Sequence, residues 1–234
     1  MTREARPLVV GVDLAPPGAL NLGVPGTPDF RGFEVDLLAE LSARLGRPLR
    51  FQAGLWADLL NRLNSGQLDL ICTAVTRTPE RERQFAFSRP YLRVVLALVC
   101  RPDSVVPSLD HVKGPMAVRV NTLAELHLRE HFPGVIRTFH HNTDVYGAVT
   151  SRTVAAAVDD LPIAAYFAHT SSDLCVAATL PNTESEYGLV MRQTDQDLRG
   201  AIDRAILQLR ADGTYQQFYA RWLQPFLGDG GLLA

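Results

Sequence analysis

FEVDLLAELSARLGRPLRFQAGLWADLLNRLNSGQLDLICTAV, residues 33–75, alternates between two kinds of hydrophobic pattern. Apolar residues recur at helical spacing before each of two glycines, Gly46 and Gly66, and a strand-like run follows each glycine. With the apolar run that precedes this stretch, the order is βαβαβ, which predicts a parallel sheet with helices on its faces. We expect strands over 7–13, 49–54 and 69–75, and helices over 33–46 and 56–66. The first helix is expected to bury Val35, Leu38, Leu41 and Leu45.

The second half of the chain continues this alternation of strands and helices. A Thr122-x-x-Glu125 capping box marks the start of one helix, Pro162 suits the first turn of another, and Thr194 is the expected N-cap of a third. The expected strands are 115–120, 135–140, 154–160, 174–179 and 187–191, and the expected helices are 122–132, one that begins at Asn142, 161–170, 195–213 and 214–223.

Composition argues against several classes of function. The chain has 234 residues, a formal net charge of -2 and a pI near 6.3, so it has no bulk electrostatic attraction for nucleic acid. No apolar run approaches the ~20 residues that a membrane helix needs. The three cysteines, Cys72, Cys100 and Cys175, have apolar neighbours and a spacing that matches no metal pattern, so we interpret them as partly buried thiols.

Polar residues follow the predicted strands of the first half. In open parallel sheets, ligands bind beyond the carboxyl ends of the strands. Asp13 ends the first strand, Trp56 follows the second, and residues 73–76 end the third. These residues are therefore expected on one rim of the sheet.

The block TRTPERERQFAFSRPY, residues 76–91, places Arg81 near that rim. Thr78 is a good N-cap and Pro79 a good first helical residue, so Arg81 falls in the first helical turn. The helix dipole disfavours a positive charge there, and a bound anion would offset that cost. The planar guanidinium can take both oxygens of a carboxylate. The alternative is that Arg81 pairs at the surface with Glu80, Glu34 or Asp36.

Longer motifs resemble a known family. The segments GFEVDLLAELSARLG (32–46), W-x-x-L-L-x-x-L-x-S-G-x-x-D-L-I (56–71) and TPERERQFAFSRPYL (78–92) are similar to the amino-acid-binding family of periplasmic solute-binding proteins. These are the type 2 Venus flytrap proteins, family 3, that serve ABC importers. The remaining agreement is in AVRVNTLAE (117–125), AAAVDDLPIAAY (155–166), EYGLVM (186–191) and AILQLRADGTYQQFYARWL (205–223), so the resemblance spans nearly the whole chain.

The resemblance implies an α/β fold of two Rossmann-like lobes joined by two crossing strands, near 94–100 and 186–190. Lobe 1 would comprise residues 1–93 plus 185–234, and lobe 2 residues 94–184, with the ligand cleft between the lobes. Such a protein captures an amino acid or a similar small zwitterion by lobe closure and delivers it to the permease of an ABC transporter. The implied partners are the small-molecule ligand and the permease. No catalysis, cofactor, metal or nucleic acid is expected.

The resemblance also implies a cellular location. The protein would act as a monomer in the periplasm or at the cell surface. The sequence shows no signal peptide, because residues 1–6 are polar and a strand pattern begins directly after them. We expect that such a peptide has been removed.

The family's ligand contacts carry over residue by residue. Arg81 would clamp the ligand α-carboxylate, and Asp160 would hold the α-ammonium, with Asp159 as the alternative if the register shifts by one. A zwitterion needs a cation and a carboxylate a few ångströms apart, and charge-assisted bonds of this kind contribute ~1.5–3 kcal/mol each. The other implied contacts are Thr73, Ala74 and Thr76 upstream of Arg81, Asn121 and Thr122 beside the carboxylate, Asp13 as a second cation partner, and Trp56 against the ligand side chain.

The chain departs from the family pattern in three places. Arg77 stands where an apolar residue is usual, Asn121 replaces a glycine, and the first loop carries Pro16 and Pro17 instead of an aromatic residue. Arg77 suggests an additional anionic group on the ligand.

Two other functions stay open on this fold, and one motif suggests a metal. A sensor or receptor ligand-binding domain would share the fold. Cyclohexadienyl dehydratases resemble the chain through the first lobe, but Ile163 stands where they carry a catalytic glutamate, and their Gly-Gly-Thr-Asn turn is absent. HLREH (127–131) matches an inverted zinc-peptidase pattern, yet so short a match without a third ligand is interpreted as a helix surface.

Overall fold

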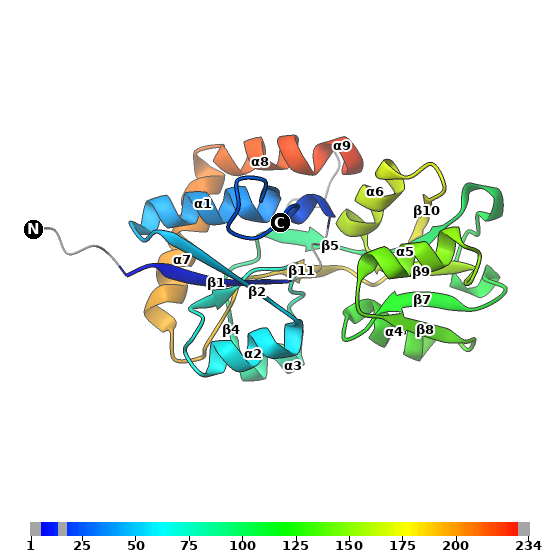
Figure 1. The fold of residues 1–234 in the computed structure, drawn as a ribbon, viewed down its shortest axis with the longest axis horizontal. Coiled ribbons are helices and arrows are strands. Elements are labelled where there is room, and N and C mark those ends of the chain that lie inside the picture. The colour runs from blue at the N-terminus through cyan, green and yellow to red at the C-terminus, as the bar shows by residue number, and fades with distance from the viewer. Residues whose placement is uncertain (1–5, 14–17, 229–234) are drawn as a thin grey trace, which may run out of the picture. The chain divides into compact units, whose positions relative to one another are not determined.

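The computed structural model describes residues 6–13 and 18–228 (Figure 1). Pro16 and Pro17, at which the first loop departs from the family pattern, lie outside the described residues. The chain forms two compact units. The first unit consists of the residues up to Arg93 together with those from Glu186 onward, and the second is Val94–Ser185.

A five-stranded sheet in the order β2-β1-β3-β12-β4 forms the centre of the first unit. β1, β2 and β3 are parallel, whereas β12, from late in the chain, is antiparallel to both of its neighbours. The strands are β1 (Leu8–Asp13), β2 (Leu49–Gly54), β3 (Leu70–Ile71), β4 (Ala86–Phe87) and β12 (Val190–Met191). The helices are η1 (Gly18–Leu20), α1 (Phe33–Leu45), α2 (Trp56–Asn64), α3 (Pro79–Gln84), α7 (Gln196–Ala211), α8 (Thr214–Trp222) and α9 (Gln224–Leu227).

Helices cover both faces of this sheet. α1 packs against α7 and α8, and Figure 1 shows α1 and α8 on one side of β1 and β2, with α2 and α3 on the other. The sheet is therefore buried between two helical layers, as the near-continuous apolar strands require. The α/β class expected from the alternating patterns is confirmed.

The second unit has its own five-stranded sheet, in the order β10-β6-β9-β7-β8. β7, β8 and β9 are parallel, and β6 is antiparallel to β9 and β10. The strands are β6 (Leu96–Cys100), β7 (Met116–Arg119), β8 (Ile136–Phe139), β9 (Ala156–Asp160) and β10 (Cys175–Thr179). The helices are η2 (Pro102–Ser104), η3 (Leu109–His111), α4 (Leu123–His131), α5 (Asn142–Thr150) and α6 (Leu161–Thr170).

The chain passes between the units twice, after Arg93 and after Ser185. Both passages lie in a two-stranded sheet formed by β5 (Leu92–Val94) and β11 (Ser185–Tyr187).

Helix caps follow local rules at most of the expected positions. Gly46 closes α1 in the left-handed conformation, with φ 62°. The Thr78 hydroxyl accepts the Arg81 N–H at 3.3 Å, and the Thr122 hydroxyl accepts the Glu125 N–H at 3.2 Å. Thr194 is not the cap that was expected, because α7 begins one residue later and Asp195 is its N-cap, without a side-chain cap bond.

Two further expectations about the first unit were wrong in detail. The strand expected over 69–75 is limited to Leu70–Ile71, because the chain leaves the sheet direction before Ala74, which has a positive φ of 51°. In α1, Leu38 and Leu41 are buried as expected, but the buried face is turned away from the other two expected residues. Val35 and Leu45 are only half-buried, and the fully buried residues are Phe33, Glu34, Leu37, Leu38 and Leu41.

Alanine substitutions at two glycines test how closely the backbone packs at the start of α1. Gly32 has φ 144°, and a Cβ atom there would lie 2.4 Å from the Leu20 carbonyl oxygen, whereas a Cβ at Gly46 would meet nothing within 4 Å. Gly46→Ala should cost about 1 kcal/mol of unfolding free energy, because only its left-handed conformation resists a side chain. Gly32→Ala should cost about 3 kcal/mol or more, since the backbone must also move. Urea denaturation of both variants measures the difference, and equal losses would contradict the close packing of Gly32.

Candidate functional site

In the first unit, the parallel register gathers polar groups at the carboxyl edge of the sheet. Asp13 is paired with Gly54 of β2, two residues before Trp56 opens α2. The Asp13 N–H donates to the Thr73 hydroxyl at 3.2 Å, and both residues are buried. The structure therefore brings Asp13 and Thr73 together and places Trp56 close by along the chain, as the strand order predicted.

A buried carboxylate holds the loop that follows β3. Glu34 is 1% exposed, and its Oε1 atom accepts the Ala74 N–H at 2.6 Å and the Tyr91 hydroxyl. Its Oε2 atom accepts Nδ2 of Asn21 at 2.8 Å. Burial is the main cause that raises the pKa of Glu34. The bond from the Ala74 N–H to Glu34 holds Ala74 in a left-handed conformation that non-glycine residues seldom adopt.

Sequence reasoning missed this role of Glu34. The residue looked like an ordinary acid in the first turn of a helix, where the dipole favours negative charge. Its three partners lie 13, 40 and 57 residues away in the chain. A possible signal was its position beside Phe33 and four residues before Leu38, on the apolar side of the helix.

Arg81 lies at the same edge, and neighbouring groups hold its guanidinium. Nη1 donates to the Thr76 carbonyl oxygen at 2.9 Å. The guanidinium carbon lies 5.2 Å from the ring centroid of Trp56, in cation–π geometry. Both contacts hold the planar fork, so its direction is set before any ligand arrives. Thr76 itself is buried and bridges to Tyr187.

Two of the three acids considered as surface partners of Arg81, Glu34 and Asp36, are engaged elsewhere. Glu34 is buried as described. Asp36 accepts Nε1 of Trp222 at 2.7 Å and Nη1 of Arg221 at 3.0 Å. Those bonds tie α1 to α8 rather than to the rim.

Arg77 is paired within the first unit. Its guanidinium contacts Glu82 at 2.6 Å and Glu186 at 3.5 Å. These ion pairs account for the charge at position 77 without an extra anionic group on a ligand.

In the second unit, Asn121 and Thr122 follow the carboxyl end of β7. Thr122 caps α4, and its hydroxyl also donates to the Arg119 carbonyl oxygen at 2.7 Å. Asn121 has a positive φ of 62°, and its N–H donates to Glu125 at 2.6 Å. The Glu125 carboxylate thus reaches one residue further back than the capping box predicts. An asparagine tolerates this conformation where the family uses glycine.

Asp159 and Asp160 end β9 and have different environments. Asp159 is buried, and it accepts the Tyr146 hydroxyl at 2.8 Å and the Asp160 N–H at 2.8 Å. Burial, followed by the charge of Asp160, raises the pKa of Asp159 to about 7. Asp160 is partly exposed and is the N-cap residue of α6. Asp159 is therefore committed to the interior, and Asp160 is the acid of the pair at the edge.

Parallel pairing brings the predicted residues of this unit to one edge. Met116 pairs with Ala156 and Ala117 with Ala157, so the ends of β7 and β9 run side by side toward Thr122 and Asp160. One polar residue at the same end of the sheet was missed. Asn142 opens α5 after β8, is 2% exposed, and its amide has no hydrogen-bond partner among the described residues.

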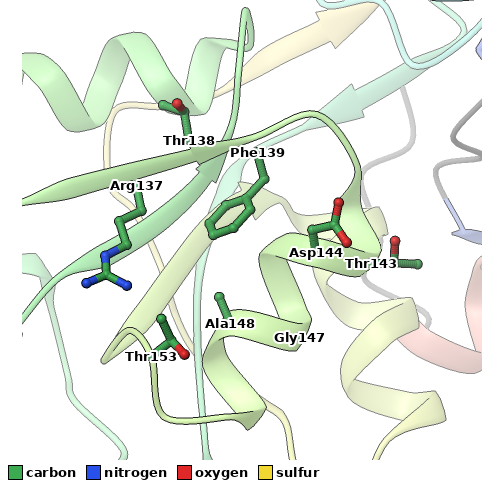
Figure 2. A pocket seen from close by; sticks show the side chains of 8 residues that line it. All are labelled: Arg137, Thr138, Phe139, Thr143, Asp144, Gly147, Ala148 and Thr153. Carbon is green, nitrogen blue, oxygen red and sulfur yellow. The ribbon is translucent and has the colours of Figure 1, made fainter.

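A separate groove runs between β8 and α5 (Figure 2). Its volume is about 710 Å³, and Figure 2 shows Arg137 and Phe139 on the side of the strand that faces α5, with Thr138 on the other. None of the expected ligand contacts lines this groove.

The zinc pattern does not assemble a metal site in the described part of the chain. His127 and His131 stack with ring centroids 4.2 Å apart, but residues 6–13 and 18–228 hold no group of three or more metal-binding side chains. In the same residues, no helix has the length and apolarity to cross a bilayer.

Comparison with known proteins identifies the family. The model of bacterial extracellular solute-binding proteins, family 3, matches residues 8–225, so the chain belongs to this family, as its motifs suggested. L-cystine-binding protein TcyJ of Escherichia coli (strain K12) is 27% identical over 219 residues, which cover 88% of this chain and 82% of that protein. Arginine-binding extracellular protein ArtP of Bacillus subtilis (strain 168) is 26% identical over 198 residues, covering 82% and 77%.

Solved structures agree with this assignment. The crystal structure of AncCDT-1, an ancestral amino acid-binding protein and a precursor of cyclohexadienyl dehydratase, has a TM-score of 0.84 and 27% identity, and the match covers 92% of this chain and 95% of that one. The chain is therefore a solute-binding protein with the fold of amino acid binders.

The buried carboxyl of Asp159 predicts a pH-dependent stability. Its pKa rises from 3.8 to about 7 on folding, so the folded protein binds the proton more tightly than the unfolded chain. This contribution to stability is complete below the unfolded pKa and is lost as pH rises through the folded pKa. The loss between pH 4 and pH 7 should be on the order of 3 kcal/mol.

Urea denaturation across that pH range tests this prediction. Asp159→Asn should remove this part of the pH dependence, because the amide does not titrate. Asp173→Asn, at an exposed loop position of the same unit, is the matched control and should keep it. An unchanged pH profile in Asp159→Asn would contradict the assignment.

Proposed function

We propose that this protein captures an amino acid or a similar small zwitterion and delivers it to an ABC transporter. The main support for this proposal is the guanidinium of Arg81, which is held by the Thr76 carbonyl and the Trp56 ring at the carboxyl edge of the first sheet. An arginine fixed in this way is preorganised for a carboxylate. The names of TcyJ and ArtP, which describe binders of cystine and arginine, support an amino acid as the ligand class.

Each remaining residue has a defined part in the proposal. In the first unit, the Thr73 hydroxyl and the backbone around Ala74 and Thr76 supply further polar contacts for the ligand carboxylate. The Trp56 ring would pack against the ligand side chain, and Asp13 would serve as a second cation partner.

The second unit would hold the other end of the ligand. Asp160 would accept the α-ammonium, and Asn121 and Thr122 would add contacts to the carboxylate. Asn142 adds an amide at the same sheet end that could bind a polar ligand atom. A ligand that both units contact would favour the closed arrangement over the open one, because only the closed one allows all contacts together.

The proposal assigns binding and no catalysis to this chain. The curated relatives described above are binding proteins. Ile163, at the position of the dehydratases' catalytic glutamate, is 5% exposed in the first turn of α6, so an apolar side chain fills that place. The proposal further places the protein in the periplasm or at the cell surface, as a monomer that docks on a permease. The family's extracellular character supports this location.

Removing the guanidinium at position 81 should abolish amino acid binding. The carboxylate would lose a pair of charge-assisted bonds of ~1.5–3 kcal/mol each, so Arg81→Ala should raise Kd at least about 100-fold. Arg77→Ala is the matched control, because Arg77 lies on the same segment and is paired with Glu82 and Glu186. Calorimetric titration with the amino acid found by a thermal-shift screen measures both. Retained affinity in Arg81→Ala would refute the carboxylate clamp.

The ammonium role of Asp160 has a separate test. Asp160→Asn should raise the Kd for α-amino acids by about 10-fold or more, since one charge-assisted bond is lost. Matched ligands that lack the amino group should lose little affinity. Calorimetry with each amino acid and its deaminated analogue gives the comparison. Equal losses for both ligands would assign Asp160 another role.

A further inference from the structure

Two of the three cysteines are direct neighbours in the second unit. β6 and β10 are antiparallel, and their register pairs Cys100 with Cys175. Directly opposed residues of an antiparallel pair project to the same face of the sheet, with Cβ atoms ~4.5–5.5 Å apart. The two residues are 75 positions apart in the chain, which is why their spacing in the sequence did not suggest a pair.

The sulfur atoms are within reach of a covalent bond. The Sγ atoms lie 3.8 Å apart, and the Cys175 thiol also approaches the Cys100 carbonyl oxygen at 3.6 Å. A disulfide requires an S–S distance of ~2.0 Å and Cα atoms ~4.4–6.8 Å apart. Paired antiparallel residues have Cα separations of ~4.5–5.5 Å, which fall in that range. Small side-chain rotations therefore suffice, without a change of strand register.

The two thiols differ in access to solvent. Cys100 is 0% exposed on β6, in the interior of the sheet. Cys175 is partly exposed on β10, which is the edge strand. Cys72, the third cysteine, is buried in the first unit, whereas the pair belongs to the second. A reagent in solution would therefore meet Cys175 first, with Cys100 in place behind it.

We propose that Cys100 and Cys175 are a modification site that forms an intramolecular disulfide by exchange with a disulfide oxidant. The extracellular character of the family supports this, because thiols outside the cytoplasm meet an oxidising environment. The Cys175 thiolate attacks one sulfur of the oxidant, whose S–S bond breaks and releases one thiol. The Cys100 thiolate then attacks Cys175 in the mixed disulfide and releases the second thiol. The protein loses two electrons and two protons, and the oxidant gains both.

The bond would constrain most of the second unit. The closed loop contains β7, β8 and β9 and their helices, all between Cys100 and Cys175. A crosslink over so long a loop restricts the unfolded chain strongly. It also fastens the edge strand β10, whose ladder is interrupted by a register shift between Val176 and Ala178. Burial, with the contact to Cys100, raises the pKa of Cys175 to about 11, so the exchange should be slow and must be followed to equilibrium.

Thiol counting on the unmodified chain tests the proposal. Reduced protein is incubated with oxidised glutathione, quenched with acid, denatured and alkylated, and its peptides are mapped by mass spectrometry. The expected result is that the three thiols fall to one, that Cys72 alone is alkylated, and that the Cys100 and Cys175 peptides are linked. Three alkylated thiols, or a glutathione adduct that persists on Cys175, would overturn the proposal.

Thermal unfolding provides a second readout. The oxidised wild-type protein should melt about 5 °C above the reduced protein, or more. Cys175→Ser is the matched control, since it keeps the size of the partly exposed side chain, and its Tm should not depend on the redox state. A wild-type Tm that is the same in both states would contradict a crosslink across β6 and β10.

Discussion

The buried carboxylate of Glu34 connects four segments of the first unit. Through its bonds to Asn21, Ala74 and Tyr91 it joins the start of α1 to the η1 loop, to the loop after β3, and to the chain just before β5. A polar group in the interior is stable only when its hydrogen bonds are met, so these segments must keep their places together. The left-handed Ala74 depends on this bond. The backbone that the proposed ligand carboxylate would contact is therefore positioned by a residue that the ligand does not need to touch.

Parallel strand pairing positions the candidate residues in both sheets. In each unit the strands that carry candidate residues run in the same direction, so short loops after separate strands meet at one edge. In the first unit this edge carries a fixed guanidinium, and in the second it carries the partly exposed Asp160. The two aspartates at the end of β9 show how burial separates adjacent identical groups. One is hydrogen-bonded in the interior with a raised pKa, and the other remains at the edge.

The sequence could predict those features of the fold that depend on residues close together in the chain. The alternation of strands and helices, the caps at Thr78 and Thr122, and the left-handed Gly46 are local features, and the structure has them. The failures involve distant contacts. Helical spacing could not tell that Glu34 would lie inside and Val35 at the margin, because the partners of Glu34 come from other segments. The early end of β3 also depends on a distant contact, the bond from the Ala74 N–H to Glu34. The pairing of Cys100 with Cys175 required the strand order of the second sheet.

Much of the candidate site was named by resemblance to the family and not by the residues alone. Arg81 was also a candidate from its position alone, since a positive charge in the first turn of a helix is disfavoured unless an anion offsets it, with a surface ion pair as the alternative. The structure adds the contacts that hold it, from the Thr76 carbonyl and the Trp56 ring. Asn142 could not be singled out in advance, because a polar residue at the start of a helix is usually a solvated cap.

The position of β12 has a consequence for the order in which the chain can fold. β12 lies between β3 and β4, yet it comes from residues 190–191, after the whole of the second unit. As the chain is synthesised from its N-terminus, the second unit, Val94–Ser185, is complete before the first sheet can close. Until then β3 and β4 lack the strand that joins them. Domains that are continuous in sequence form from nearer contacts and fold faster than those that close over long loops. The unit encoded as an insertion should therefore be the first to reach its native structure, while the unit built from two separate segments of the chain completes its sheet afterwards.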